Sequence, residues 1–221
     1  MLPPDLPSGG YGLDGESRPD EVDQAMKIGE IIETTTIGFV AESEELNRPP
    51  ALGSLVKVQV GGADYAYGIV SYGTTISPEP GRRAVRRSTE EVFDEAIYDE
   101  HPQLRRILHT EFNVILVGWI EDGLIHQHLP PQPPPLHHSV YQCTSEEVRA
   151  FSQRLYYLRL LLSAPGEVSA EQLVAAHVRE TYRQRGEDTE WLERAARELA
   201  SLLKHDYERL MTILYAIEPA Y

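Results

Sequence analysis

The sequence contains a single cysteine, Cys143, among 221 residues, so no disulfide can form within the chain. It has no run of about 20 apolar residues, which is the length that a membrane-spanning helix needs. The first residues also lack the basic and apolar regions of a secretory signal peptide. These absences predict a protein without membrane segments in a reducing compartment, and we expect the cytoplasm.

Positive charge is scarce as well. Lys and Arg total 20 against 35 Asp and Glu, which gives a formal net charge of −15. No segment of the chain is net basic, whereas free-standing DNA-binding proteins rely on basic groups that neutralise phosphates. Direct DNA binding is therefore not expected, and a protein partner or self-association is expected instead.

Composition divides the chain into three parts. Residues 1–26 are acidic, rich in Pro and Gly and poor in apolar residues, which predicts a disordered tail. Residues 27–143 have the β-branched and alternating patterns of strands, and residues 144–221 have helical periodicity. We predict an α+β fold in which a small closed or partly open β-barrel with a helical insert precedes a C-terminal region of three helices.

The strand-rich part contains two predicted hairpins. Val56, Val58 and Val60 alternate with other residues up to a Gly-Gly turn, after which a second strand returns. The apolar stretch Phe112–Ile120 is followed by Glu-Asp-Gly and by a returning strand over Leu124–Leu129. Two strands are also expected within residues 27–43, with a break near Thr34–Thr36, and one more within residues 138–143.

A helical insert in two pieces is predicted between these hairpins. Ser88 or Thr89 can cap the first piece, and Pro102 can open the second at its first turn. The preceding loop has four arginines, which could contact phosphate or an acidic partner. Six acidic residues follow them and balance their charge, so a solvated loop is the favoured interpretation. The four are Arg82, Arg83, Arg86 and Arg87.

The C-terminal part begins with a helix that is expected to run from a capping box, with Thr144 as the N-cap and Glu147 as the N3 residue, to Ala164–Gly166. A second helix is expected from Ser169 to a stop at Gly186, and a third, of about 28 residues, from Asp188. The third helix has more apolar positions than one stripe needs. We therefore expect some of them to face a partner or a second copy, and the candidate interface residues are Leu203, Leu210 and Leu214.

The segment from Leu129 to Ser139 contains five prolines within six residues. Proline cannot donate a ladder hydrogen bond and favours an extended polyproline conformation, so we expect a stiff strap between two strands. The run also fits P-x-x-P, which proline-reading domains bind, but its place inside the fold favours the structural interpretation.

Residues 27–143 resemble the HAS-barrel, the small β-barrel at the N-terminus of HerA-type DNA translocases and of catalytic ATP-synthase subunits. The resemblance rests on Ile28-Gly29-Glu30, on Gly53 and on Gly68-Ile69-Val70. It implies a barrel that assembles side by side with others or docks partner proteins. The motor that follows the barrel in the translocases has no counterpart here, because G-x-x-x-x-G-K-[ST] is absent and "GGADYAYG" lacks the lysine.

Two alternatives involve residues near the second hairpin. His126, His128, His137 and His138, together with Cys143, offer nitrogen and sulfur ligands for a metal-dependent enzyme. However, no carboxylate lies between Asp122 and Glu146, and partly exposed polar residues at a strand end are the simpler interpretation. Aromatic residues along the strands could stack bases as a single-stranded nucleic-acid barrel does, but no basic groove accompanies them. These aromatic residues are Tyr65, Tyr67, Tyr72, Phe112 and Trp119.

The sequence therefore predicts a non-enzymatic assembly or adaptor protein built on a HAS-barrel. Its partner would be a HerA-type DNA translocase or a nuclease system, by resemblance alone. No catalytic residue and no cofactor is expected.

Overall fold

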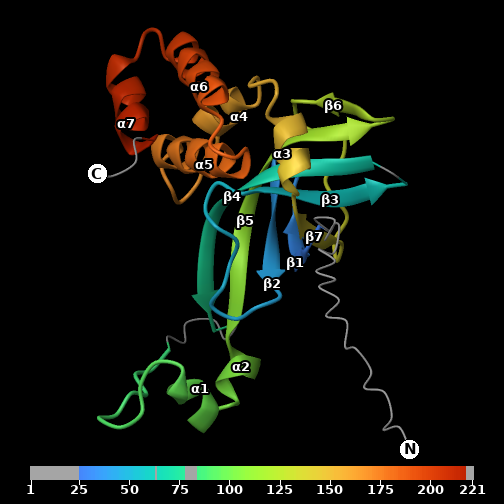
Figure 1. The fold of residues 1–221 in the computed structure, drawn as a ribbon. Coiled ribbons are helices and arrows are strands. Elements are labelled where there is room, and N and C mark those ends of the chain that lie inside the picture. Colours follow the sequence, from blue (N-terminus) through green and yellow to red (C-terminus); the bar gives the residue numbers. More distant parts are fainter. Residues whose placement is uncertain (1–24, 63, 78–83, 218–221) are drawn as a thin grey trace, which may run out of the picture.

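The computed structural model describes residues 25–62, 64–77 and 84–217. Within these ranges, six antiparallel strands close a barrel, and a seventh strand pairs with the end of one of them outside the closed circle. Helices cover one side of the barrel (Figure 1). The predicted α+β fold with a closed barrel is confirmed. The predicted tail, residues 1–26, lies outside the described residues except for its last two. The strands are β1 (Lys27–Thr34), β2 (Gly38–Ser43), β3 (Leu55–Gly61), β4 (Asp64–Ile76), β5 (His109–Glu121), β6 (Leu124–His126) and β7 (Ser139–Gln142).

The barrel closes because β5 pairs with β4 on one edge and with β2 on the other. The strand order is β2-β1-β7-β3-β4-β5, and β2 pairs again with β5 to complete the circle. In this closing pair, Phe39 lies opposite Val114. Beyond the contact with β2, the same edge of β5 pairs with β6, where Trp119 lies opposite His126. Both predicted hairpins, β3–β4 and β5–β6, are present.

Alternation along β3 separates two hydrophobic cores. Val56 and Val58 belong to the core inside the barrel, whereas Leu55 belongs to a second core that the barrel shares with the helices. Lys57 also faces the helices, where it forms a salt bridge with Glu147. The second core contains residues from both the strand-rich part that ends at position 143 and the helical part that follows it. The helices are therefore fixed to the barrel by buried apolar surface.

Five helices follow the barrel in the described part of the chain, and not the predicted three. They are α3 (Ser145–Phe151), α4 (Leu158–Ser163), α5 (Ala170–Gln184), α6 (Thr189–Leu202) and α7 (Tyr207–Ile217). The predicted caps are confirmed: Thr144 and Glu147 form a capping box, Ser169 accepts a hydrogen bond from the backbone N–H of Gln172, and Gly186 has a φ of 74° after α5.

The first predicted helix is wrong in its middle, because side chains from elsewhere bind its backbone. The Gln127 amide donates to the carbonyls of Phe151 and Arg154, at 2.6 and 2.9 Å, and accepts from the N–H of Tyr156. Trp191 Nε1 donates to the carbonyl of Ser152 at 2.8 Å. These partners replace the helical hydrogen bonds between α3 and α4, so the chain turns there despite its periodic apolar residues.

The predicted helix of about 28 residues from Asp188 is also wrong. It is divided into α6 and α7, and the turn between them ends at Asp206. Asp206 accepts a hydrogen bond from the N–H of Arg209 at 3.3 Å, and its carbonyl accepts from Leu210. Aspartate favours such a cap over a helix interior, so a new helix begins here and folds back over α5.

The predicted insert forms an arm that extends from the ladder between β4 and β5 (Figure 1). Its helices α1 (Ala96–Glu100) and α2 (Leu104–Ile107) are shorter than predicted and begin later. Thr89 does not cap a helix, because its hydroxyl accepts from Val92 within a turn.

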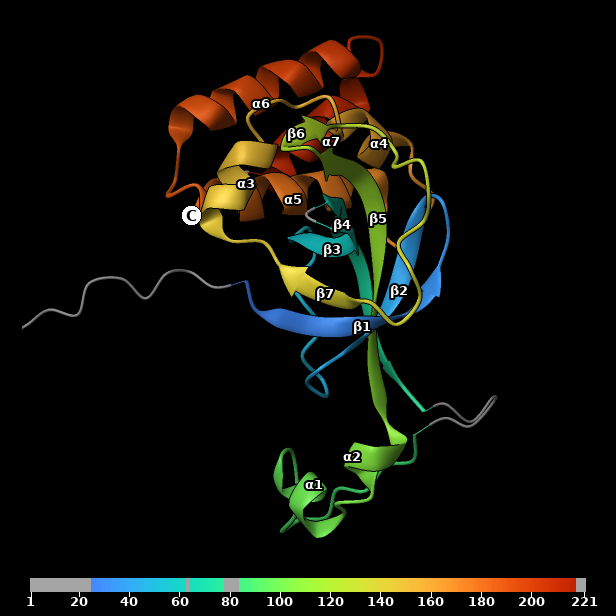
Figure 2. The same cartoon turned by 90° about the vertical axis from the view of Figure 1, so that its right-hand side faces the viewer.

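The proline-rich segment connects β6 to β7 along the outside of the barrel (Figure 2). It has no regular secondary structure, but it is fixed to β1 by hydrogen bonds. Thr34 Oγ1 donates to the carbonyl of Pro134 at 2.8 Å, and the backbone of Ile31 exchanges bonds with His137 and His138. The segment therefore serves as the strap that its composition predicts.

Candidate docking surfaces and the framework that positions them

The arm, which is described over residues 84–108, is the first candidate surface. None of its described residues is buried, although several are large and apolar. Val85, Phe93 and Ile107 are 74%, 57% and 41% exposed. A groove of about 810 Å³ opens between the arm's segments and is lined by Val85, Phe93, Ile97 and Leu104 among others. Apolar side chains gathered on a segment without a core of its own are typical of a binding surface.

The arm is attached to the barrel by strands and by one side-chain contact. The ladder between β4 and β5 continues to the pair Ile76 and His109, where the arm begins and ends. In the neighbouring ladder pair, the hydroxyl groups of Thr75 and Thr110 lie 2.8 Å apart. Asn47, in the loop after β2, donates to the hydroxyl of Tyr98 at 2.7 Å.

The second candidate surface is a cleft of about 320 Å³ between the barrel and the α4–α5 connection. Its lining is mainly apolar and includes Ile37, Ile115, Leu129 and Leu160. Among the described residues that line it, the charged ones are Glu33 and Glu167, and both are exposed. The cleft therefore offers an apolar floor with negative charge beside it, which favours a neutral or cationic occupant over an anion.

The wall of this cleft that α4 and the α4–α5 connection form belongs to the helical region, which is fixed to the barrel where α5 meets Gly53. A Cβ atom at this glycine would lie 2.4 Å from the backbone nitrogen of His177, and its φ is +86°, so no larger residue fits. His177 Nδ1 lies 2.7 Å from the Gly53 carbonyl, and Nε2 lies 2.8 Å from the Tyr157 hydroxyl. Because a carbonyl only accepts, Nδ1 donates and Nε2 accepts, which defines one neutral tautomer.

Burial lowers the pKa of His177 to about 4, against the opposing hydrogen bond to Gly53. The imidazole is therefore neutral at pH 7. Burial also raises the pKa of the Tyr157 hydroxyl well above its usual range, so the hydroxyl remains a donor. The contact of α5 with the barrel is an uncharged hydrogen-bond chain whose members satisfy one another.

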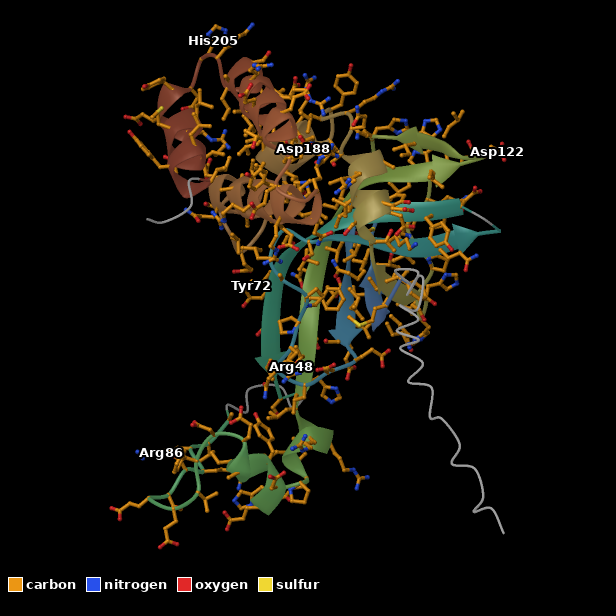
Figure 3. The ribbon with its side chains drawn as sticks, in the orientation of Figure 1. Arg48, Tyr72, Arg86, Asp122, Asp188 and His205 are labelled. Carbon is orange, nitrogen blue, oxygen red and sulfur yellow. The ribbon has the colours of Figure 1, made fainter. Side chains whose placement is uncertain are left out.

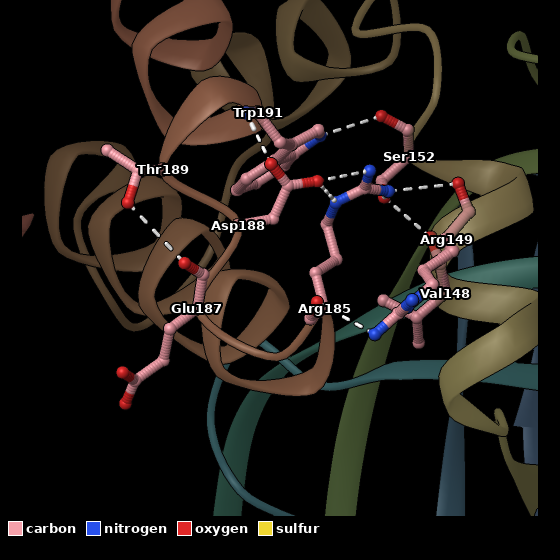
Figure 4. A network of polar contacts seen from close by, with 8 residues as sticks. All are labelled: Val148, Arg149, Ser152, Arg185, Glu187, Asp188, Thr189 and Trp191. Carbon is pink, nitrogen blue, oxygen red and sulfur yellow. Dashed lines mark hydrogen bonds and ion pairs between the residues drawn. The ribbon is translucent and has the colours of Figure 1, made fainter.

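A second buried group, Arg185, holds α3, α5 and α6 together (Figure 4). Its guanidinium donates to the carboxylate of Asp188 through two nitrogens, at 2.8 and 3.2 Å. It also donates to the carbonyl of Arg149 and the hydroxyl of Ser152, and it lies 5.4 Å from the ring centroid of Trp191. The hydrogen bond from the backbone N–H of Trp191, together with those from Arg185, holds the pKa of Asp188 below its usual range.

The four candidate histidine ligands have different neighbours, and only His126 and His128 have a ring contact with each other. His126 stacks on Trp119 at a ring-centroid distance of 4.5 Å, and His128 lies 5.5 Å from His126. His137 pairs with Glu30 at 2.9 Å, whereas His138 binds the carbonyl of Gln59. In the described part of the chain, no three His, Cys, Asp or Glu side chains are grouped so that they could hold a metal ion.

Cys143 is buried in the core between the barrel and the helices. Burial raises the pKa of its thiol well above the usual value, and the nearby Glu147 carboxylate raises it further. A thiol in this environment stays protonated, so the residue has the properties of a small apolar side chain and not those of a nucleophile.

The three leucines proposed as a partner interface occupy different environments. Leu203 is 6% exposed and belongs to the core shared with the barrel. Leu210 is half-buried and packs against the same core, and Leu214 is half-buried on α7. The exposed aromatic residues of α7 are Tyr207 and Tyr215, at 71% and 69%. The interface assigned to the leucines stays a prediction.

Sequence reasoning did not identify the residues that define the two surfaces. Val85 lies between two pairs of arginines, of which Arg82 and Arg83 lie outside the described residues. An isolated apolar residue in a charged loop was a signal that could have directed attention to it. Glu33, Glu167 and His177 carry no such signal, because only the fold brings the β1–β2 turn, the α4–α5 connection and α5 to their places.

Comparisons with known proteins add no identification. No protein-family model matches the chain, and a search of curated proteins found no similar sequence. Within the described residues, no helix combines the length and apolar character that crossing a membrane requires.

Proposed function

We propose that this protein is a non-enzymatic assembly or adaptor module that docks through its arm. The arm supports this proposal because it presents large apolar side chains and none of its described residues is buried. The described part of the arm, residues 84–108, contributes no buried residue to either core, yet Val85 and Phe93 are more than half exposed. A partner that covers these side chains explains their exposure.

The resemblance to HAS-barrels directs the proposal towards DNA-processing machinery. The closed barrel of six strands agrees with that resemblance in architecture. The proposed partner is a HerA-type DNA translocase or an associated nuclease in the cytoplasm, with self-association as a second property of the same module. The net charge of −15 favours docking to a protein over direct docking to DNA.

The test is to remove the arm without disturbing the barrel. Ile76 and His109 are ladder partners, so an Asn-Gly turn can join their strands in place of residues 77–108. Because the described arm buries no residue, the shortened chain should keep its barrel and its melting temperature within a few degrees. We expect it to lose both self-association and binding to a purified HerA-type translocase from the same cell, measured by light scattering and calorimetry.

A matched control keeps the arm and alters another exposed apolar residue. Leu124 on β6 is 65% exposed, so Leu124→Glu changes a comparable surface away from the arm. This variant should associate like the wild type. Association and translocase binding that survive removal of the arm would refute the proposal, as would a wild-type chain that neither self-associates at micromolar concentration nor binds the translocase.

A further inference from the structure

The cleft between the barrel and the α4–α5 connection has lining that specifies the chemistry of its occupant. Ile37 and Leu129, which line it, are 51% and 37% exposed, so apolar surface is open to solvent there. The carboxylates of Glu33 and Glu167 form no ion pair or side-chain hydrogen bond within the described residues. An occupant with a short apolar side chain followed by positive charge would cover the apolar surface and neutralise these carboxylates.

The arm contains a segment with this chemistry. Val85 is the most exposed large apolar residue described, at 74%, and Arg86 and Arg87 follow it directly. Arg86 donates to the hydroxyl of Ser88, and no ion pair engages either arginine in the described part of the chain. The segment Ala84–Arg87 therefore presents an exposed apolar side chain and two cations that have no counter-ion among the described residues.

In one molecule, the part of the cleft that carries Glu33 and Ile37 is separated from the arm along β2. Glu33 and Ile37 in the cleft lie just before β2 begins. The arm leaves the barrel beyond the other end of that strand (Figures 1 and 2). Figure 3 shows Arg86 on the arm, far from Tyr72, which lines the cleft. The six residues of β2 alone span about 20 Å, and the arm extends beyond them. Ala84–Arg87 therefore does not reach Glu33 and Ile37 in the cleft of its own chain.

From this complementarity we infer that the cleft receives the segment Ala84–Arg87 of a second copy of this chain. Val85 covers the apolar floor beside Ile37 and Leu129, and the two arginines pair with Glu33 and Glu167. The inference rests on the proposed assembly function, and it names the partner and the two complementary surfaces. Because both surfaces are on every chain, copies join arm to cleft, either reciprocally in a pair or in one direction around a ring.

Charge reversal in two sets of variants tests the inference. The arm variant carries Arg86→Glu and Arg87→Glu, and the cleft variant carries Glu33→Arg and Glu167→Arg. All four positions are exposed, so the folded state should persist, which circular dichroism checks. Each variant alone places like charges at both contacts, and we expect its self-association to weaken about tenfold or more.

Mixing the two variants restores opposite charges at every arm-to-cleft contact. An equimolar mixture should therefore recover association close to that of the wild type, and salt should weaken both. Arg197→Glu on α6, where the arginine side chain is 71% exposed, is the control and should leave association unchanged. Mass photometry and sedimentation measure all of these samples.

The outcomes separate this inference from the proposed function. If removing the arm abolishes association but the charge variants associate like the wild type, or if their mixture does not recover, the arm docks elsewhere and the inference is wrong. If the wild-type chain is a monomer at all concentrations tested, the inference is wrong whether or not the arm binds a translocase.

Discussion

His177 should make the stability of this protein depend on pH in a defined window. The imidazole is fully buried between the Gly53 carbonyl and the Tyr157 hydroxyl, and its pKa is lowered from 6.5 to about 4. In the unfolded chain the same group has its ordinary pKa of about 6.5. Below that pH the unfolded state therefore binds a proton that the folded state does not bind.

The sign and the size follow from these two pKa values. The contribution of His177 is fully present above pH 6.5 and is lost progressively as the pH falls towards 4, where the folded state also takes up the proton. One pKa unit corresponds to about 1.4 kcal/mol, so the loss across the window is about 3 kcal/mol. This is a large part of the 5–15 kcal/mol by which domains are typically stable.

Urea unfolding at several pH values between 4 and 8 measures this dependence. His177→Gln removes the titrating group but keeps a donor for Gly53 and an acceptor for Tyr157, so its stability should change less with pH than that of the wild type. The difference between the two curves isolates His177 from the other histidines. Parallel curves would refute the reasoning. If the variant does not fold, an NMR titration of the wild type decides, because a pKa near 6.5 for His177 would refute it equally.

Two further predictions concern the framework between the barrel and the helices. Gly53→Ala should lower the free energy of unfolding by about 2 kcal/mol or more, because the added Cβ would overlap the backbone of α5 and φ at this position is +86°. Urea unfolding measures this change. Gly123→Ala is the control, since Gly123 also has a positive φ but a Cβ there would have nothing within 4 Å. Arg185→Ala should lower the free energy of unfolding by about 3 kcal/mol or more. Arg185→Lys should recover only part of this loss, because one ammonium cannot donate in all the directions of the guanidinium. Equal stability of Arg185→Ala and the wild type would contradict this account of the network.

Local signals in the sequence determined most of the elements. The alternation of Val56 and Val58 predicts a strand with one face in a core, and the Gly61-Gly62 turn predicts its hairpin partner. Thr144 and Glu147 lie at the spacing of a capping box, and Gly186 ends α5 in the left-handed region that favours glycine. These features depend on contacts within a few residues, so the sequence alone contains the information that fixes them.

Features that depend on distant partners were decided only by the tertiary structure. The break between α3 and α4 comes from Gln127 and Trp191, which are far along the chain and whose side chains take the place of helical hydrogen bonds. The close approach of Gly53 to His177 joins residues 124 positions apart. Likewise, the cleft exists because the β1–β2 turn and the α4–α5 connection meet beside Leu129. A periodic pattern records which residues are apolar, but it does not record which remote groups satisfy a backbone carbonyl or lie against an exposed carboxylate, because packing of the whole chain sets those distances.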